Sequence, residues 1–540
     1  MSAGEREAGA AQTSAGPRAP EDPRAAGSAP EDDELAPLPP GMRRALVTFT
    51  TLLVSVMATI DATIVAICMP QMQGSLDASP TTIVWVMTMF NIGQAIGIAL
   101  TGKLAMGFGR RRVMLIAIAG FVLLSCLCGI ATSLDEMVIG RFLQGLFAAP
   151  LIPLSQATIV DAYPAAERQR GLAIWTMGVV VGPAIGPALG GVLTEHLSWR
   201  MAFFVNVPIG AAALLLTWIF VRRTPRVPVR LDAIGIALVA LLVIPLQVAL
   251  DQGDTLDWFS SRTVIILLGV AAIAGAAFIA RSAGRPGSIL RLELFRDRAF
   301  ALCTANITLL GLVLFGLYTL HPTMMETLLG WQVDTAGLAM GVMGSTGFLG
   351  ALLAPRISAI IGPRSTVVLG AAIAAIGLQL GTGLNLDVGR WQAVMPGTVA
   401  MLGIVLAYVP TTALAFARVP PDQRDDAVAQ YNFVKTIGMA IGVTLIATLL
   451  YRRPEFHWNA LGGGITANAP GLEPWIDQLG EGRWTPLVAE VVAAELLRQA
   501  TMLAIVEIFR ALSLVSLAVA VIALAVPRAK ASAPSAAAAE

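Results

Sequence analysis

Two charged residues inside apolar stretches are the first candidates for chemistry in this sequence. Asp61 lies in the run from about 46 to 69, and Arg141 lies in the run from about 137 to 160. Charged side chains inside a membrane are costly and are usually paired or functional. Counting about 1.5 Å per helical residue from opposite ends of these runs places both at a similar depth in the outer half of a bilayer. We therefore predict that Asp61, assisted by Arg141, carries protons; the alternative is a static ion pair holding two helices in register.

Uncharged polar side chains in the apolar runs are candidates for a substrate cavity. Each must hydrogen-bond inside a membrane or face a polar cavity. The candidates are Thr63, Asn91, Gln94, Gln144, Asn306 and Asn432. Asn91 and Gln94 are also compatible with hydrogen bonds to neighbouring helices. Lys435 lies near one end of its run, where its ammonium group is equally compatible with reaching the membrane surface.

Other kinds of site are not indicated. The four cysteines all lie in apolar runs, which is typical of packing residues rather than of disulfides or metal ligands. The three histidines lack metal-ligand spacing, and we find no nucleophile triad, phosphate loop or nucleic-acid patch. We therefore expect no enzymatic activity, no cofactor, no metal and no nucleic-acid partner.

A glycine- and proline-rich stretch provides a second kind of candidate. Its members are Gly178, Gly182, Pro183, Gly186, Pro187, Gly190 and Gly191. Four-residue steps place four of the glycines on one helix face, with no side chains to hold a neighbour away. The two prolines each remove a backbone donor, so we expect them to bend the helix. Such a face suits two spans that approach closely and shift; the alternative is a packing helix without a role in transport. We expect Val180 to lie elsewhere on the helix and to tolerate enlargement.

The composition identifies the class of protein that must position these residues. Of 540 residues, 56% are hydrophobic and only 13% are charged, whereas soluble domains are about 25% charged. We therefore predict an all-α membrane protein with fourteen transmembrane helices in a lipid bilayer. The expected spans are 46–69, 81–104, 113–132, 137–160, 171–194, 201–221, 232–250, 263–280, 299–320, 335–360, 365–384, 392–417, 429–451 and 501–526.

The basic residues indicate the orientation of these spans. They cluster in alternate connectors, for example at 110–112 and 222–226, whereas the short loops on the other side hold only Arg200, Arg262 and Arg390. The positive-inside rule then places both termini in the cytoplasm and the chain in the cytoplasmic (inner) membrane. Residues 452–500 form a long outside loop. Its second part has a helical pattern, which we expect to lie on the outer membrane surface or to dock to a partner.

An internal repeat divides the chain. The segments Gly102–Leu115 and Pro355–Val368 align Gly109 with Gly362, and they occupy the connectors after the second and tenth spans. This spacing predicts two six-helix halves with two extra helices between them, and a substrate site where the halves meet. The expected parts are 42–222 and 291–527 for the halves, 223–290 for the extra helices, and 1–41 and 528–540 for disordered cytoplasmic tails.

These residues resemble motifs of the major facilitator superfamily. The glycine–proline stretch, followed by WRMAFFVNVPIG from Trp199 to Gly210, resembles the antiporter motif and flank of its fourteen-span drug:proton antiporter family, the EmrB/QacA type. Arg141, Gln144 and Gly145 resemble an RxxQG motif linked in that superfamily to proton coupling. The pattern of Asn432 and Lys435 is similar to one that usually has arginine at the second position.

A further resemblance concerns the connector after the second span. Gly102, Gly109, Arg110 and Arg111 resemble the superfamily's cytoplasmic loop motif. Met106 stands where that motif has a carboxylate, so the salt bridge usually given to it is lost. In the first span, Ala66 likewise stands where the family has asparagine.

The resemblance covers about Arg43 to Pro527 and implies a major facilitator fold with two six-helix halves plus two extra central helices. It implies proton-coupled efflux of small amphipathic compounds, such as drugs or toxic metabolites, by alternating access. Relatives with a long outside loop often work with a periplasmic adaptor, which the resemblance implies as a partner. One alternative is a proton-coupled importer of the same fold. Another is a membrane receptor or scaffold, which would need no buried Asp61 and Arg141.

Overall fold

The computed structural model describes residues 38–79, 82–226, 228–229, 232–283, 288–289, 291–463 and 485–527. All regular secondary structure in these residues is helical. The expectations for the two tails fall almost wholly on residues 1–37 and 528–540, which lie outside the described residues, as do residues 464–484 of the long loop.

The first half of the chain forms six long helical segments, two of which are interrupted. The helices are α1 (Met42–Ser75), α2 (Trp85–Phe108), α3 (Arg110–Ile130), α4 (Leu134–Ala148), α5 (Leu151–Ala162), α6 (Arg168–His196), α7 (Met201–Phe204) and α8 (Asn206–Phe220). The fourth expected span is divided into α4 and α5 at Pro150, whose ring nitrogen cannot donate a helical hydrogen bond. α6 runs without interruption through its prolines.

Two extra helices follow, α9 (Ala233–Gln252) and α10 (Arg262–Ser282), with the short turn η1 (Trp258–Ser260) between them. They pack on each other, and α9 also contacts α2. Thr88 of α2 donates a hydrogen bond of 2.5 Å to Asp251 of α9. Arg452, far along the chain, forms an ion pair of 3.1 Å with Asp257 before η1. The extra pair is therefore attached to both halves.

The second half repeats the first, and its last two long helices exceed their counterparts in length. Its elements are η2 (Leu292–Arg296), α11 (Arg298–Thr323), η3 (Met324–Leu328), α12 (Val333–Ile361), α13 (Pro363–Leu380), η4 (Gly381–Gly383), α14 (Arg390–Ala415), η5 (Pro421–Gln423), α15 (Arg424–Gly462) and α17 (Pro486–Ala525).

The packing of the helices confirms the internal repeat. In the first half α1 packs on α6, α2 on α4, and α3 on α8. In the second half the corresponding helices pair in the same way, α11 with α15, α12 with α14, and α13 with α17. The aligned glycines also match, because Gly109 and Gly362 both have φ of 87° and each ends one helix and precedes the next. A residue with a side chain would be strained at this φ.

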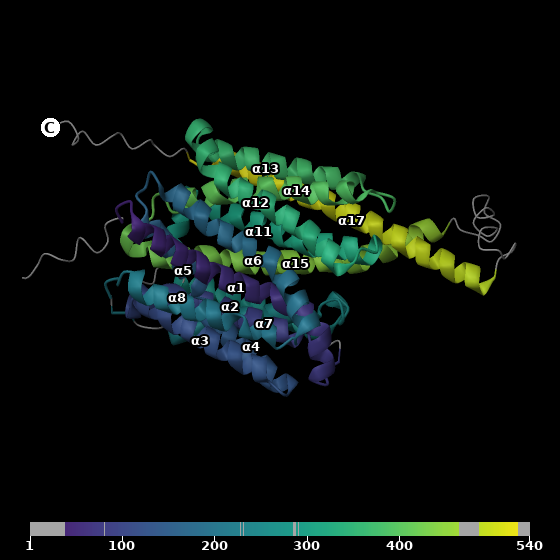
Figure 1. Cartoon of the computed structure of the whole chain (residues 1–540), viewed down its shortest axis with the longest axis horizontal. Helices are drawn as coiled ribbons and strands as arrows, with labels where there is room; N and C mark the ends of the chain where they lie inside the picture. Colours follow the sequence, from purple (N-terminus) through teal and green to yellow (C-terminus); the bar gives the residue numbers. More distant parts are fainter. Residues whose placement is uncertain are drawn as a thin grey trace, which may run out of the picture.

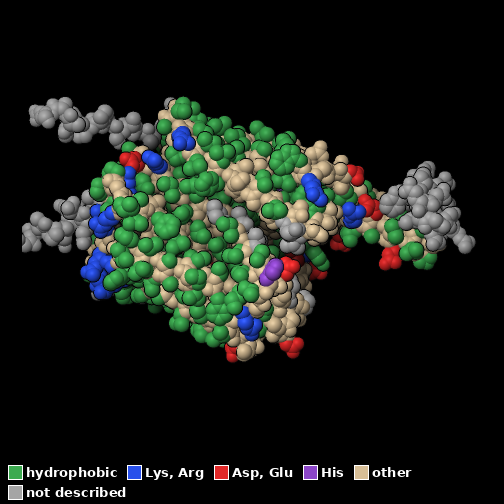
Figure 2. All heavy atoms as spheres, in the orientation of Figure 1, with side chains coloured by type: hydrophobic (Ala, Val, Ile, Leu, Met, Phe, Trp, Pro, Cys, Tyr) green, Lys and Arg blue, Asp and Glu red, His purple; other side chains and the backbone are tan. Residues whose placement is uncertain are grey.

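The two halves form two layers, with α6 and α15 between them (Figure 1). The contacts between the layers are made mainly by α6 with α12 and by α15 with α2 and α5. α1 begins and α17 ends at the same end of the molecule (Figure 1). On the face shown in Figure 2, the middle of the molecule is largely apolar and basic side chains gather at that same end.

The number of spans is only partly confirmed. Twelve helical segments of the described residues are long and apolar enough to cross a membrane. α2 and α6, with 24 and 29 residues, fall outside that group, although they occupy the expected second and fifth positions. The chain is a multi-pass helical membrane protein, and the count of fourteen stays a prediction.

The described parts of the expected loop 452–500 are helical apart from the residues at their ends, which corrects the sequence-based boundary. α15 continues to Gly462 and α17 starts at Pro486, so the two helices have 39 and 40 residues. They pack on each other, and α17 projects beyond the helix bundle (Figure 1). The predicted surface helix is thus the first part of α17 rather than a separate element. Polar residues end the apolar run there, but they do not end the helix.

Candidate functional site

Asp61 and Arg141 lie together in the core of the first half. Asp61 comes from the middle of α1 and Arg141 from α4, and both side chains are 0% exposed. Arg141 Nη1 lies 2.9 Å from Asp61 Oδ2. The proximity expected from their depths is therefore present, while their role in proton transfer stays a proposal.

Two amide side chains complete the coordination of the carboxylate. Asp61 Oδ1 accepts hydrogen bonds from Gln144 Nε2 at 3.1 Å and from Asn206 Nδ2 at 2.8 Å. Gln144 lies one turn after Arg141 on α4, so its Oε1 also accepts from Arg141 Nη1 at 2.7 Å. Both carboxylate oxygens are thus engaged, as a buried charge requires.

The guanidinium group is held by α2. Arg141 Nε donates to the carbonyl of Val86 at 3.3 Å, and the guanidinium carbon lies 4.0 Å from the centre of the Phe90 ring. Arg141 Nη2 is buried and has no hydrogen-bond partner among the described residues. The guanidinium group therefore has one unused donor next to its single carboxylate. A change in the charge of Asp61 could then rearrange its hydrogen bonds.

Sequence reasoning missed the role of Asn206. It belongs to the quoted WRMAFFVNVPIG stretch, but no pattern linked it to Asp61. In the structure Asn206 begins α8, and its Nδ2 contacts both Asp61 and Ser125 Oγ, the latter at 3.0 Å. The sequence did contain one signal for this role, because Asn206 is a polar amide at the start of an otherwise apolar span. We call Asp61, Arg141, Gln144 and Asn206 the acid cluster.

All four residues of the acid cluster belong to the first half. Rocking of the halves as rigid bodies would leave the distance between Asp61 and Arg141 unchanged. Any change in this distance requires α1 and α4 to move within one half.

The glycine face of α6 packs directly on α1. A Cβ atom on Gly178 would lie 2.7 Å from Leu52, and one on Gly190 would lie 2.9 Å from Ile64. At Gly182 and Gly186 it would overlap Thr59 Oγ1 and Thr63 Oγ1. The four glycines thus allow α6 to approach the helix that carries Asp61, as expected for close packing. A Cβ on Gly191 would meet nothing within 4 Å, so this residue is not part of the contact.

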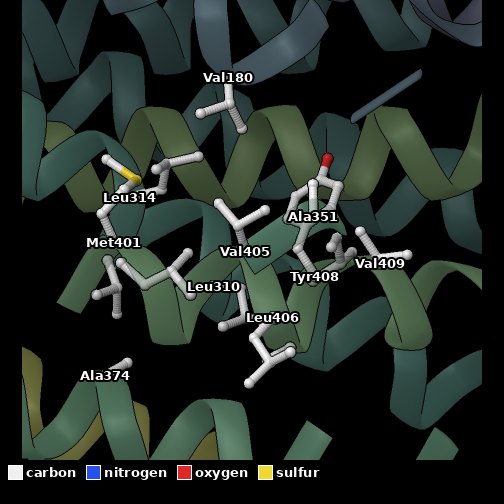
Figure 3. Packing of buried hydrophobic residues seen from close by; sticks show 14 of the residues in the cluster. Val180, Leu310, Leu314, Ala351, Ala374, Met401, Val405, Leu406, Tyr408 and Val409 are labelled. Atoms are coloured by element: carbon white, nitrogen blue, oxygen red, sulfur yellow. The ribbon is translucent and has the colours of Figure 1, made fainter. Parts of the chain in front are cut away.

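The opposite side of α6 faces the second half, which corrects the expectation for Val180. Val180 is 3% exposed and belongs to a core cluster that joins the two halves. Figure 3 shows it above Val405, Leu314 and other apolar residues of the second half. Its carbonyl accepts a hydrogen bond of 3.3 Å from Tyr318. Enlarging Val180 would therefore disturb the contact between halves and is not a neutral change.

The cytoplasmic loop motif lies in a network of ion pairs between halves. Arg110 Nη1 lies 2.7 Å from Asp161 on α5, and its Nη2 lies 2.7 Å from Asp425 on α15. Lys103 Nζ lies 3.1 Å from Asp426, which also pairs with Arg291 Nε at 2.8 Å. Asp425 and Asp426 of α15 therefore hold the second half against α2 and α3.

Two motif residues make this approach possible and one supports it. A Cβ on Gly102 would lie 2.7 Å from Asp426 Oδ1 and 3.0 Å from its Cα, so only glycine fits there. Gly109 supplies the left-handed turn described above. Arg111 donates to the backbone carbonyl of Trp218. Met106 offers no charge, and the carboxylates come from α5 and α15 instead. The network Lys103, Arg110, Asp161, Arg291, Arg424, Asp425 and Asp426 is called the inter-half network below.

The predicted cavity residues do not form one group. Gln144 belongs to the acid cluster. Thr63 is half-buried, hydrogen-bonds to its own helix and packs on Gly186. Asn91 is exposed and Gln94 half-buried on α2. Asn306 is buried on α11, and its Oδ1 has no partner among the described residues.

Asn432 joins the two halves. Its Nδ2 donates to Gln156 Oε1 of α5 at 2.7 Å, and its Oδ1 accepts from Lys435 Nζ at 2.8 Å. Lys435 is 8% exposed, so its ammonium group does not reach the membrane surface.

Near the other end of α15, Arg453 and His457 both lie against Glu507 of α17. Arg510, three residues after Glu507 on α17, is exposed and forms no ion pair with it among the described residues.

Comparisons with known proteins agree with this architecture. Residues 51–443 match the family described as Major Facilitator Superfamily. The chain is 30% identical over 479 residues to the multidrug export protein EmrB of Escherichia coli, covering 87% of this chain and 92% of that protein. It is 33% identical over 428 residues to the fatty acid resistance protein FarB of Neisseria gonorrhoeae, covering 79% and 84%.

Solved structures share the fold at low sequence identity. The proton:xylose symporter XylE superposes with a TM-score of 0.59 and 15% identity, covering 90% of this chain and 96% of that one. The human organic anion transporter MFSD10 gives a TM-score of 0.57 and 16% identity, covering 89% and 100%. With its two repeated six-helix halves, its family match and its EmrB-like sequence, the chain belongs to the Major Facilitator Superfamily.

Proposed function

We propose that this protein exports small amphipathic compounds across the cytoplasmic membrane in exchange for protons, with Asp61 as the proton-carrying group. The observation that supports this proposal most is the fully buried Asp61 carboxylate with its three side-chain donors. The multidrug export protein EmrB and the fatty acid resistance protein FarB support export as the direction. The substrates are the small amphipathic molecules that such names imply.

Protonation of Asp61 changes the balance of charge in the acid cluster. The ionised carboxylate neutralises Arg141 and accepts from both amides. A proton on either oxygen removes the negative charge and leaves Arg141, which cannot lose its own proton, without a counter-ion. An unpaired buried guanidinium is strongly unfavourable, so α1 and α4 are driven to a different arrangement.

α6 connects this change to the second half. One of its faces packs on α1 through Gly182 and Gly186, and its other face contacts α12 through Val180 and Gly347. A shift of α1 therefore displaces α6 against the second half. The acid cluster lies within one half. We therefore assign α6 as the helix that transmits the protonation state of this cluster to the interface between the halves.

Everted membrane vesicles with an acidic lumen test this function. Addition of a transported compound should release lumenal protons, whereas an importer that couples uptake to protons would move them the other way. Asp61→Asn keeps the size of the side chain and mimics the protonated acid. We expect it to abolish transport driven by a pH gradient while retaining exchange of labelled for unlabelled substrate.

Asp77→Asn is the matched control, because Asp77 is exposed at the outer end of α1 and makes no ion pair in the described structure. It should transport like the unaltered protein. If Asp61→Asn still concentrates substrate under a proton gradient, Asp61 is structural. If no compound moves protons in the unaltered protein, the proposal of antiport fails as a whole.

Both termini are assigned to the cytoplasm, with the end of α15 and the start of α17 outside. In a variant without the four native cysteines, Gly463→Cys should react with an impermeant thiol reagent added from outside, and Arg226→Cys should not. Reaction of Arg226→Cys alone would reverse the orientation. The outer part of α17 is where a periplasmic adaptor would meet this chain.

A further inference from the structure

Lys435 is a buried cation without an anionic partner. Three other buried basic side chains are neutralised, since Lys103 pairs with Asp426, Arg110 with Asp161 and Asp425, and Arg141 with Asp61. Arg168, at the cytoplasmic start of α6, donates to the carbonyl of Val160. Among the described residues, Lys435 Nζ contacts only neutral oxygens, Asn432 Oδ1 at 2.8 Å and Tyr408 OH at 3.4 Å.

These groups form a polar chain that crosses from one half to the other. It begins at Gln156 of α5, whose Oε1 accepts from Asn432 Nδ2, and it ends at Lys435 and Tyr408 in the second half. Gln156 Nε2 is buried and has no partner among the described residues. The chain therefore has an uncompensated cation at one end and an unused neutral donor at the other.

The position of Lys435 makes this arrangement costly. It lies 11 residues after the start of α15 at Arg424, which corresponds to roughly 16 Å along the helix and to the interior of the bilayer. A buried ammonium without a counter-charge is unfavourable there, and intramembrane charges generally mark substrate pathways. Both unsatisfied groups are donors, so the ligand that would satisfy them is an acceptor with negative charge.

We propose that Lys435 binds the negatively charged head group of the exported compound, with Gln156 Nε2 as a second donor, so that the preferred substrates are amphipathic organic anions. This inference rests on the proposed export function and names its substrate class. The apolar body would lie against the apolar cluster that contains Tyr408 and also includes Val405, Leu310 and Leu314 (Figure 3).

Access to Lys435 follows from the inter-half network. Asp425 and Asp426 lie less than two turns before Asn432 on the same helix, and they hold α15 against α2 and α3. When the halves part on this side, the hydrogen bond between Asn432 and Gln156 breaks with them. The ammonium group then faces the opening from the cytoplasm, where an exporter takes up its substrate.

Binding to the purified full-length protein tests this proposal without any proton gradient. Three fluorescent probes share a naphthyl body and carry a sulfonate, a hydroxymethyl or a trimethylammoniomethyl head. We expect the sulfonate to bind about tenfold more tightly than the uncharged probe, because a hydrogen bond between charged groups is worth roughly that ratio. Lys435→Gln should lose this preference and bind the uncharged probe as before, while Lys435→Arg should retain it.

A second variant leaves Lys435 in place. Gln156→Glu has the size of the native side chain and adds a carboxylate across the polar chain, so it should also weaken binding of the sulfonate. The proposal is overturned if the unaltered protein does not prefer the sulfonate, or if Lys435→Gln retains the preference. Equal loss of all three probes in a folded Lys435→Gln protein would instead assign the lysine a structural role. Absence of proton release with every probe would reject antiport but not this binding preference.

Discussion

The acid cluster and the inter-half network are both built from carboxylates and basic side chains, but they differ in isolation and in placement. The cluster has one carboxylate and one cation, both 0% exposed, inside a single half. The network has three carboxylates and four cations, and it links the two halves. Asp161 and Asp426 each have two basic partners.

This difference indicates that the two regions have different roles. A network in which charges share partners can break one contact without leaving a charge alone, which suits an interface that must open and close. An isolated buried pair has no substitute partner, so one proton alters its whole balance. The cluster is suited to sensing a proton, and the network is suited to holding and releasing the halves.

Removing the cation of the cluster should have the largest effect on stability. Arg141→Gln leaves Asp61 buried without a counter-ion, which should lower the free energy of unfolding by about 3–5 kcal/mol at neutral pH. The double variant Asp61→Asn, Arg141→Gln should recover most of this loss. Thermal unfolding of the purified proteins measures both. Losses that simply add in the double variant would show that the two residues do not act as a pair.

The connection between the two regions is tested at α6. Gly182→Leu would place a side chain into Thr59 and Ile60 of α1, so it should cost about 1–3 kcal/mol of stability and abolish transport. Ile185→Leu is the control, because Ile185 is 44% exposed on the same helix. Vesicle transport at matched expression compares them. Equal activities would remove the packing argument for the glycine face.

A cation of the network should matter less than Arg141. Lys103→Gln removes a pair of similar length and burial, but Asp426 keeps Arg291 at 2.8 Å. We expect a loss of about 1–2 kcal/mol in the same unfolding assay. A loss as large as that of Arg141→Gln would mean that sharing of partners gives no protection, and the contrast between the two regions would fail.

The smallest effect is expected outside both regions. Arg418 pairs with Asp297 at 3.7 Å, and their side chains are 49% and 35% exposed. Arg418→Gln should change the free energy of unfolding by less than about 1 kcal/mol, because exposed pairs gain little over their hydration. A larger change would show that exposure does not separate the pairs in this protein.

The sequence predicted the features that depend on one span or on depth alone. Apolar runs located the helices, and the alignment of Gly109 with Gly362 located the repeat. Counting residues from the membrane surface predicted that Asp61 and Arg141 lie at a similar depth. Partners from other spans were not predictable in this way. Asn206, Gln156 and Asp425 have no spacing relation to the residues they contact, because helix packing alone brings them together.

Helix ends were the least predictable part of the fold. Hydropathy marks where the membrane ends, while a helix continues as long as its residues permit. The described segments 451–462 and 486–500 contain Arg453, Glu495 and other polar residues, and they remain helical. The absence of a carboxylate at Met106 likewise indicated a missing salt bridge, although α15 supplies the charge from the other half.

The continuity of α15 over 39 residues has a mechanical consequence. One helix carries Asp425 near its start, Lys435 further along and Arg452 toward its other end. From Arg424 to Arg452 it measures roughly 42 Å, so a rigid tilt of about 10° displaces its two ends relative to each other by about 7 Å. If the halves part at Asp425, α15 therefore carries that movement to its other end, where α17 lies against the same helix.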